Sequence, residues 1–357
     1  MKRNIFSKEI KIGNKTIGEG KPSYIIAEIG ANFDSSLEVA KQYCLAAKEA
    51  GADCAKFQSF KAEKIVSDGG FKQMKLKGVH GTWDKSVFEV FKSVEFPREW
   101  HKPVSDYCNE IGIDFSTSPY DFEAVDLCME LDVPFIKIGS GELTWLEMIH
   151  KIASTQKPIF LATGDATMSE IDEAIRTIET TGNQSVVLMQ CITNYPSQIE
   201  SANINVLKTY EYAFNILTGY SDHSPGNVVV LGAIALGAKV IEKHFTLDKK
   251  GKGPDHPHSM DFNEFKSMVD DIRKLELAMG SSRKFLVEEE EETVYVQRRG
   301  LYINRAMKKG EVITLSDVDV LRPALGILPK YKNVVIGQQL AHDIEKDSPL
   351  KWDHLTQ

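Results

Sequence analysis

From residue 23 onward, short apolar segments alternate with amphipathic segments along the chain. The apolar segments are continuous runs, which indicates strands of a parallel sheet that is covered on both faces. Strands are expected at 23–30, 53–58, 113–118, 134–140, 158–164, 186–191, 215–221 and 239–245. Helical patterns lie between them, for example at 37–50, where Gly51 follows as a stop signal.

The pattern thus repeats eight times within about 260 residues, each strand being followed by a helical pattern. This predicts an α/β fold of the (β/α)8 TIM-barrel type over residues 1–280. A doubly wound open sheet is the alternative, but no GxGxxG motif follows the first strand. Residues 9–19 alternate around Gly13 and Asn14, which predicts an N-terminal β-hairpin that covers one end of the barrel.

The pattern changes after residue 280. Residues 281–297 contain the acidic run EEEEE at 288–292, which is typical of a solvated linker or a helix end. Residues 298–357 hold short apolar segments separated by Gly and Pro turns, and they predict a compact module of about 60 residues. Because the core of so small a module is marginal, we expect it to pack against its own barrel or a partner chain.

The composition narrows the functional classes. The chain has 357 residues, 42% of them hydrophobic, and a net charge of −8 without a basic patch, so nucleic acid is not an expected partner. The sequence contains no run of about 18 apolar residues, so no membrane helix is predicted. The N-terminal segment lacks the apolar region of a secretory signal. Five cysteines without CxxC spacing favour buried free thiols in a reducing compartment, so we expect a cytoplasmic protein.

Polar residues stand at the carboxyl ends of all eight expected strands, where chemistry collects in (β/α)8 barrels. A polar group at such a position costs about 1–3 kcal/mol unless it is hydrogen-bonded, so packing does not explain the set. In chain order the set is Glu28, Lys56, Gln58, Ser116, Thr117, Ser118, Lys137, Ser140, Glu142, Thr163, Gly164, Thr193, Asn194, Tyr195, Ser221, Asp222, His223, Glu242 and His244.

This set offers two kinds of binding chemistry. Lys56 and Lys137, with nearby hydroxyls, can hold a phosphate and a carboxylate. His223 and His244 come from neighbouring strands and can hold a divalent metal with open positions, which argues against a closed structural zinc site. Such a metal would polarise a carbonyl.

Side chains alternate along a strand, which limits what can face the barrel interior. Glu242 and His244 are two residues apart and can both face inward, whereas Ser140 must lie on the turn after the strand of Lys137. Asp222 is either a partner that orients His223 or a turn residue.

Several motifs resemble one known family. The segments AEIGANFDSSLEVAKQYCLAAKEAGADCAKFQ, KIGSGE, NYP, YSDHS, ALGAKVIEKHFTLD and GPDHPHS together resemble the N-acetylneuraminate (sialic acid) synthase family, with its legionaminic and pseudaminic acid synthases. KKGEVIT and LRPALGI resemble the family's antifreeze-like (SAF, β-clip) domain, expected at 298–357. The resemblance covers nearly the whole chain.

The resemblance implies that phosphoenolpyruvate condenses with an N-acyl hexosamine, either N-acetylmannosamine or a 2,4-diacetamido-trideoxyhexose. The product would be a nine-carbon 2-keto sugar acid, with release of phosphate. It implies that His223 and His244 bind Mn²⁺, with Mg²⁺ or Co²⁺ as alternatives, and that Glu28, Lys56 and Lys137 are catalytic. Substrate contacts are expected from Gln58, Thr117, Ser140, Glu142, Thr163, Gly164, Asn194, Tyr195, Ser221, Asp255 and Arg322.

The resemblance also implies a domain-swapped homodimer, in which Arg322 of one chain reaches the sugar bound in the partner's barrel. One departure is Ala162, where the family often has a serine. The segment 67–96 resembles the legionaminic and pseudaminic versions as much as the sialic one, whereas GPDHPHS favours the sialic or legionaminic branch. We expect His256 and His258 to lie on a loop near the mouth, because the strand-end histidines already serve the metal.

The sequence is also compatible with two other functions. Another metal-dependent aldolase or a seven- or eight-carbon sugar-acid synthase would use the same barrel, but it would not usually carry the small domain with Arg322. A non-catalytic carbohydrate- or ice-binding protein would leave Glu28, Lys56 and the strand-end histidines without a role.

Overall fold

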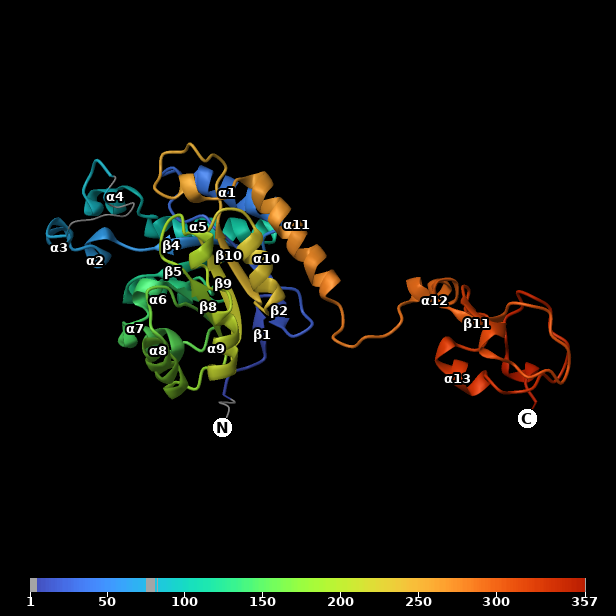
Figure 1. The fold of residues 1–357 in the computed structure, drawn as a ribbon. Coiled ribbons are helices and arrows are strands. Elements are labelled where there is room, and N and C mark those ends of the chain that lie inside the picture. Colours follow the sequence, from blue (N-terminus) through green and yellow to red (C-terminus); the bar gives the residue numbers. More distant parts are fainter. Residues whose placement is uncertain (1–4, 75–80, 82, 357) are drawn as a thin grey trace. The chain divides into compact units, whose positions relative to one another are not determined.

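The computed structural model describes residues 5–74, 81 and 83–356, and the chain forms two compact units, residues 1–280 and 281–357 (Figure 1). Part of the segment 67–96, namely residues 75–80 and 82, lies outside the described residues. None of the helices in the described part of the chain is both long enough and apolar enough to cross a membrane.

The first unit is built on one parallel sheet of eight strands, which confirms the expected barrel. The strands are β3 (Tyr24–Glu28), β4 (Cys54–Ser59), β5 (Asp114–Pro119), β6 (Ile136–Ile138), β7 (Ile159–Ala162), β8 (Val186–Cys191), β9 (Leu217–Asp222) and β10 (Val240–His244). Their order is β5-β4-β3-β10-β9-β8-β7-β6. Ser116 Oγ on β5 donates a hydrogen bond of 2.9 Å to the carbonyl of Phe135, just before β6, which links the two ends of the sheet.

Helices surround this sheet (Figure 1). They are α1 (Leu37–Glu49), α5 (Arg98–Ile111), α6 (Phe122–Glu130), α7 (Leu146–Ser154), α8 (Met168–Thr180), α9 (Val206–Phe214), α10 (Val228–Ala235) and α11 (Phe262–Met279). Local sequence sets their ends: the Ser36 side chain accepts from Val39 N at the start of α1, and Gly112, at a φ of 73°, ends α5. Three short helices, α2 (Ala62–Ile65), α3 (Asp68–Lys72) and α4 (Val87–Ser93), lie between β4 and α5.

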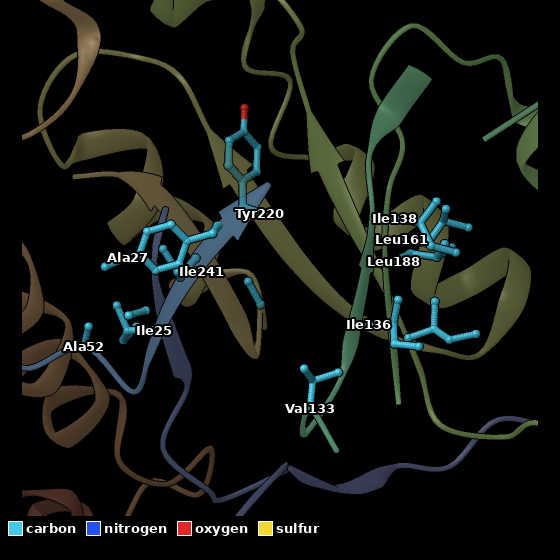
Figure 2. Close-up of a cluster of buried hydrophobic side chains, with 14 of the residues drawn as sticks. Ile25, Ala27, Ala52, Val133, Ile136, Ile138, Leu161, Leu188, Tyr220 and Ile241 are labelled. Atoms are coloured by element: carbon cyan, nitrogen blue, oxygen red, sulfur yellow. The ribbon is translucent and has the colours of Figure 1, made fainter. Parts of the chain in front are cut away.

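Strand alternation divides the apolar core into two layers. Ile25 and Ala27 on β3 and Ile241 on β10 belong to the layer between the sheet and the helices, part of which is drawn in Figure 2. Tyr24 and Ile26 point the other way, into a smaller cluster inside the barrel.

The expected hairpin is formed by β1 (Glu9–Ile12) and β2 (Lys15–Gly18), with Ile12 opposite Lys15 across the turn. Its buried residues Ile10, Ile12 and Ile17 join the smaller cluster inside the barrel. The hairpin therefore covers one end of the barrel, as predicted. This is the amino-terminal end, because Tyr24 and Val240 at the first positions of their strands belong to the same cluster.

The second unit has its own small core. Strands β11 (Gly300–Ile303) and β12 (Val318–Leu321) pair antiparallel, and α13 (Lys332–Val335) follows them. Leu301, Ile303 and Ile313 are among its fully buried residues. The segment 281–297 contains α12 (Glu291–Gln297), so the acidic run lies at the start of a helix. All five cysteines of the chain are free and buried, as expected.

Candidate active site

A cavity of about 530 Å³ opens at the carboxyl ends of the barrel strands. The structure brings most of the predicted site residues to its wall: Glu28, Lys56, Gln58, Lys137, Ser140, Glu142, Tyr195, Ser221, His223, His244 and Asp255. Ser140 and Glu142 lie on the turn after β6, as strand alternation required.

Four buried charges form the polar centre of the cavity. Lys56 forms an ion pair with Glu28 and donates to Ser118 Oγ at 3.0 Å. Lys137 Nζ donates to Glu242 Oε1 at 3.0 Å, and Lys56 Nζ lies 3.7 Å from Glu242 Oε2. Two cations and two anions therefore balance each other, which a buried cluster of this kind requires.

The two carboxylates of this cluster have opposite pKa shifts. Burial raises the pKa of Glu28 to about 7, and the attraction of Lys56 only partly opposes this. Burial also acts to raise the pKa of Glu242, but Lys137 and Lys56 outweigh it and lower that pKa to about 2. Burial likewise raises the pKa of Glu142 to about 7. Glu28 and Glu142 can thus exchange protons near neutral pH, while Glu242 stays ionised.

Neighbouring polar side chains fix the orientation of both carboxylates. Gln58 Nε2 donates to Glu28 Oε1 at 2.8 Å, and Ser221 Oγ donates to Glu242 Oε1 at 3.2 Å. Each carboxylate is therefore held in one orientation by a group from the strand beside it.

Side chains on β10 point alternately into the cavity and away from it. Glu242 and His244 face the cavity, whereas Lys243 points outward, where its ammonium pairs with Asp222 and donates to the carbonyl of Ser224 at 2.6 Å. The other oxygen of Asp222 accepts from the backbone and hydroxyl of Ser224. In the described part of the chain, Asp222 thus acts as a turn residue and as the partner of Lys243.

The histidine pair fits a divalent cation. His223 Nδ1 lies 2.7 Å from the carbonyl of Ile192, which can only accept, so Nδ1 carries the proton and Nε2 keeps its lone pair. His244 Nδ1 is buried without a hydrogen-bond partner among the described residues. Burial lowers the pKa of His223 to about 4 and that of His244 well below its usual range, so both rings are neutral at neutral pH and could bind a metal through a free nitrogen.

A third histidine lies beside this pair. The ring centroid of His258 is 4.9 Å from that of His244, and Asp255 lies next to both rings. Ligand atoms of His244, Asp255 and His258 all lie within 4.8 Å of one another. His256 and His258 both lie on the segment after β10, as predicted, and His258 lines the cavity, whereas His256 Nδ1 lies 2.8 Å from Thr246 Oγ1.

Two of the expected substrate contacts point away from the cavity. Thr117 lies between Ser116 and Ser118 on β5, and because Ser118 lines the cavity, alternation turns Thr117 toward the outside of the sheet. Thr163 follows Ala162, which lines the cavity, and the Thr163 hydroxyl lies 2.9 Å from Tyr210 Oη on α9. The side to which each strand position points therefore keeps both hydroxyls out of the cavity.

Two other predicted residues of the first unit also lie outside the cavity wall. Gly164 donates its backbone N–H to Ser140 Oγ at 3.0 Å, and an added Cβ would come within 2.9 Å of that oxygen. Gly164 therefore positions Ser140 through its backbone. Asn194 is exposed and donates to the carbonyl of Pro196, because it follows the strand end by three residues. Arg322 is exposed on the second unit, directly after β12.

One side of the cavity is apolar, which strand-end residues alone did not indicate. It is lined by Phe60, Ile65, Val66, Phe71, Trp83, Val90, Phe91 and Val94. Most of these residues belong to α2, α3, α4 and the segments beside them, so described residues of the segment 67–96 border the cavity. The sequence does contain a signal for this apolar wall, namely the apolar residues of the short helical segment VFEVF at 87–91.

Comparison with known proteins gives the family of the chain. The NeuB family model matches residues 44–284, and the SAF domain model matches residues 298–356. The N,N'-diacetyllegionaminic acid synthase of Legionella pneumophila is 35% identical, covering 96% of this chain and 97% of that protein. The pseudaminic acid synthase of Helicobacter pylori is 34% identical, covering 94% of this chain and 98% of that protein.

A solved structure shows the same likeness in three dimensions. The crystal structure of N-acetylneuraminic acid (sialic acid) synthetase from Leptospira borgpetersenii, in complex with citrate, has a TM-score of 0.71 at 26% identity. It covers 82% of this chain and 97% of that chain. The chain therefore belongs to the NeuB family of sialic, legionaminic and pseudaminic acid synthases and carries a SAF domain after its barrel.

Proposed function

We propose that this protein condenses phosphoenolpyruvate with an N-acyl hexosamine to a nine-carbon 2-keto sugar acid and releases phosphate. The supporting observation is that one cavity combines two buried lysines with histidine nitrogens that have no hydrogen-bond partner among the described residues. The lysines suit the phosphate and carboxylate of phosphoenolpyruvate, and the histidines suit a metal that binds an aldehyde oxygen.

In this reaction C3 of phosphoenolpyruvate attacks the aldehyde carbon of the open-chain sugar, the aldehyde oxygen gains a proton and becomes a hydroxyl, and positive charge develops at C2. Water adds at C2 and gives up one proton, which balances the proton taken up by the aldehyde oxygen. The bond between C2 and the phosphate oxygen then breaks, the C2 hydroxyl gives its proton to the departing phosphate, and the 2-keto group remains. Glu28 takes the proton from this water, because its pKa of about 7 keeps a large part of it ionised at neutral pH. Lys56 and Lys137 hold the two anionic groups of phosphoenolpyruvate, with the Ser140 hydroxyl beside them.

The metal is a separate part of the proposal. His223 and His244 would hold a divalent cation, most suitably Mn²⁺ and alternatively Mg²⁺ or Co²⁺. When bound, the cation supplies Lewis-acid polarisation of the sugar aldehyde. The neutral state of both rings supports this role, because only an unprotonated ring nitrogen can bind a metal.

The apolar wall favours one class of acceptor. A sugar with a 6-deoxy carbon and a second acetamido group presents two methyl groups, whereas N-acetylmannosamine presents hydroxyls at the same positions. Burial of methyl groups against Phe60, Val90 and Phe91 is favourable, and each such contact is worth about 1–3 kcal/mol in discrimination. We therefore propose a 2,4-diacetamido-2,4,6-trideoxyhexose as the acceptor, which makes the protein a legionaminic or pseudaminic acid synthase.

The quaternary arrangement is proposed from the family resemblance. Two chains would form a domain-swapped homodimer, and Arg322 of one chain would contact the N-acyl group of the sugar in the partner's barrel. The second unit has only a small core, so packing against a larger surface would stabilise it. This supports the proposed dimer.

The test is phosphate release from phosphoenolpyruvate with Mn²⁺. N-acetylmannosamine, the 2,4-diacetamido-2,4,6-trideoxy sugar of mannose stereochemistry and its altrose isomer are offered in parallel. We expect release with one diacetamido sugar and none with His244→Ala. Release with N-acetylmannosamine alone would refute the choice of acceptor, and no release from a folded chain that binds Mn²⁺ would refute the reaction.

A further inference from the structure

We infer that His258 is a ligand of the divalent metal, together with His244 and Asp255, so that the metal site extends from the strand ends onto the loop after β10. This inference rests on the metal site of the proposed function, but it makes a separate claim about which residues form that site. Nothing in the strand-end pattern pointed to it, because His258 follows β10 by fourteen residues.

The distances among these three residues suit a shared cation. His244 Nδ1 lies 3.8 Å from Asp255 Oδ2, and His258 Nε2 lies 3.9 Å from Asp255 Oδ1. Both separations are longer than a hydrogen bond, which spans about 2.7–3.2 Å. Two metal–ligand bonds of about 2.0–2.2 Å each can span them.

The burial of these nitrogens is the second observation. Both His244 and His258 have side chains that are only 7% exposed. Yet His244 Nδ1 and His258 Nε2 have no hydrogen-bond partner among the described residues. A buried polar atom without a partner is costly, and a bound cation would provide the missing interaction for both.

The carboxylate between them is held in place by the backbone. Ala31 N donates to Asp255 Oδ2 at 3.0 Å. Gly30 makes this approach possible, since it has a φ of 53° and a Cβ there would lie 2.5 Å from the same oxygen. Asp255 is thus fixed against the barrel rim, with one carboxylate oxygen toward each histidine.

The donor set has a chemical consequence. Two ring nitrogens and a carboxylate bind late first-row ions more tightly than Mg²⁺ or Mn²⁺, because affinity for nitrogen ligands rises along the series from Mn²⁺ to Co²⁺ and beyond. His223 lies outside this compact set, although its ring centroid is 5.4 Å from that of His244. The contributions of His223 and His258 can therefore be measured separately.

The experiment is a Co²⁺ titration of the full-length chain, followed by calorimetry and by the visible absorption of the bound ion. His258→Ala is compared with His150→Ala, which removes an exposed histidine on α7. We expect His258→Ala to weaken Co²⁺ binding by at least about ten-fold and to change the absorption spectrum, as loss of a metal partner does. His150→Ala should match the intact chain in both measurements. His258→Gln, which keeps a polar side chain, repeats the test if the alanine variant unfolds.

The outcomes separate the two claims. Unchanged Co²⁺ affinity and spectrum in a folded His258 variant, with loss of binding in His223→Ala, would overturn the inference and leave the strand-end pair as the site. Weakened binding in the His258 variant would support it even if the intact chain released no phosphate from phosphoenolpyruvate. In that case the proposed reaction fails and the ligand assignment stands.

Discussion

Two glutamates in the barrel interior have similar burial and different chemistry. Glu28 and Glu242 are 1% and 5% exposed, and each contacts Lys56. Lys137 donates a hydrogen bond to Glu242, and with Lys56 it keeps that carboxylate charged, whereas burial dominates at Glu28. The position of one ammonium group thus decides which carboxylate can act as a base near neutral pH.

The pH dependence of the reaction follows from this difference. The base must be ionised, and burial raises the pKa of Glu28 to about 7, so kcat/KM should fall as the pH is lowered through about 7. Glu28→Gln should lower kcat by about 10²–10⁴-fold and remove this limb of the profile. Phosphate release by the intact chain and by Glu28→Gln, measured between pH 5.5 and pH 9 at saturating metal, checks both expectations. On the acidic side, log(kcat/KM) of the intact chain should fall by about one for each pH unit.

Glu142 is the matched control, since burial also raises its pKa to about 7 within the same cavity. Glu142→Gln should keep the acidic limb of the profile, although its KM for the sugar can rise. If the limb persists in Glu28→Gln and disappears in Glu142→Gln, Glu142 is the base and the assignment of Glu28 is wrong.

At the scale of elements, the two ends of a barrel strand contribute differently: one end to the apolar core, the other to the charged cavity. Residues that face inward near the amino-terminal ends, such as Tyr24 and Val240, form an apolar cluster with the hairpin. Residues that face inward near the carboxyl ends, such as Glu28 and Glu242, carry the charges of the cavity. The hairpin therefore contributes to stability at the end opposite to the chemistry.

A truncation in the hairpin should separate stability from binding. Ile12 is fully buried, so Ile12→Ala should lower the free energy of unfolding by about 2–5 kcal/mol, through lost burial and a residual cavity. Denaturant unfolding of the intact chain and the variant gives this difference. Co²⁺ affinity of the folded variant should be unchanged, because β1 lies at the other end of the barrel.

The control for this variant is Thr16→Ala on β2, where the side chain is exposed. A surface change of this kind should stay within about 0.5 kcal/mol of the intact chain. Equal losses in both variants would show that the hairpin is not anchored through its apolar face.

At the scale of the whole molecule, the proposed dimer makes a prediction about mixed chains. If Arg322 acts in the partner's barrel, an Arg322→Ala chain and a Glu28→Gln chain lack different halves of a site. Unfolding and refolding a mixture of the two should form mixed dimers that each contain one complete site, which restores up to about a quarter of the intact activity.

Size-exclusion chromatography with light scattering checks that the mixture is dimeric, and each variant refolded alone should stay inactive. Recovery near zero in a dimeric mixture would contradict the exchange of domains. It would leave Arg322 with a role in its own chain or with none in the reaction.

The sequence by itself determined the architecture and the location of the chemistry. Continuous apolar runs with intervening amphipathic helices specified eight parallel strands, because a strand buried on both faces needs apolar residues throughout. The polar strand ends identified the face that carries the cavity, and alternation placed Glu242 and His244 inward together. These features depend on local periodicity, which a single sequence records.

The tertiary structure decided which polar residues reach the cavity and in what state. Thr117 and Asn194 stood in the right segments, but the direction of each side chain follows from strand register and turn geometry. His258 lies beside His244 because of the path of the loop after β10, and no local sequence pattern specifies that path. The pKa difference between Glu28 and Glu242 likewise arises from burial and from lysines that are distant in sequence, and only the closed barrel brings these groups together.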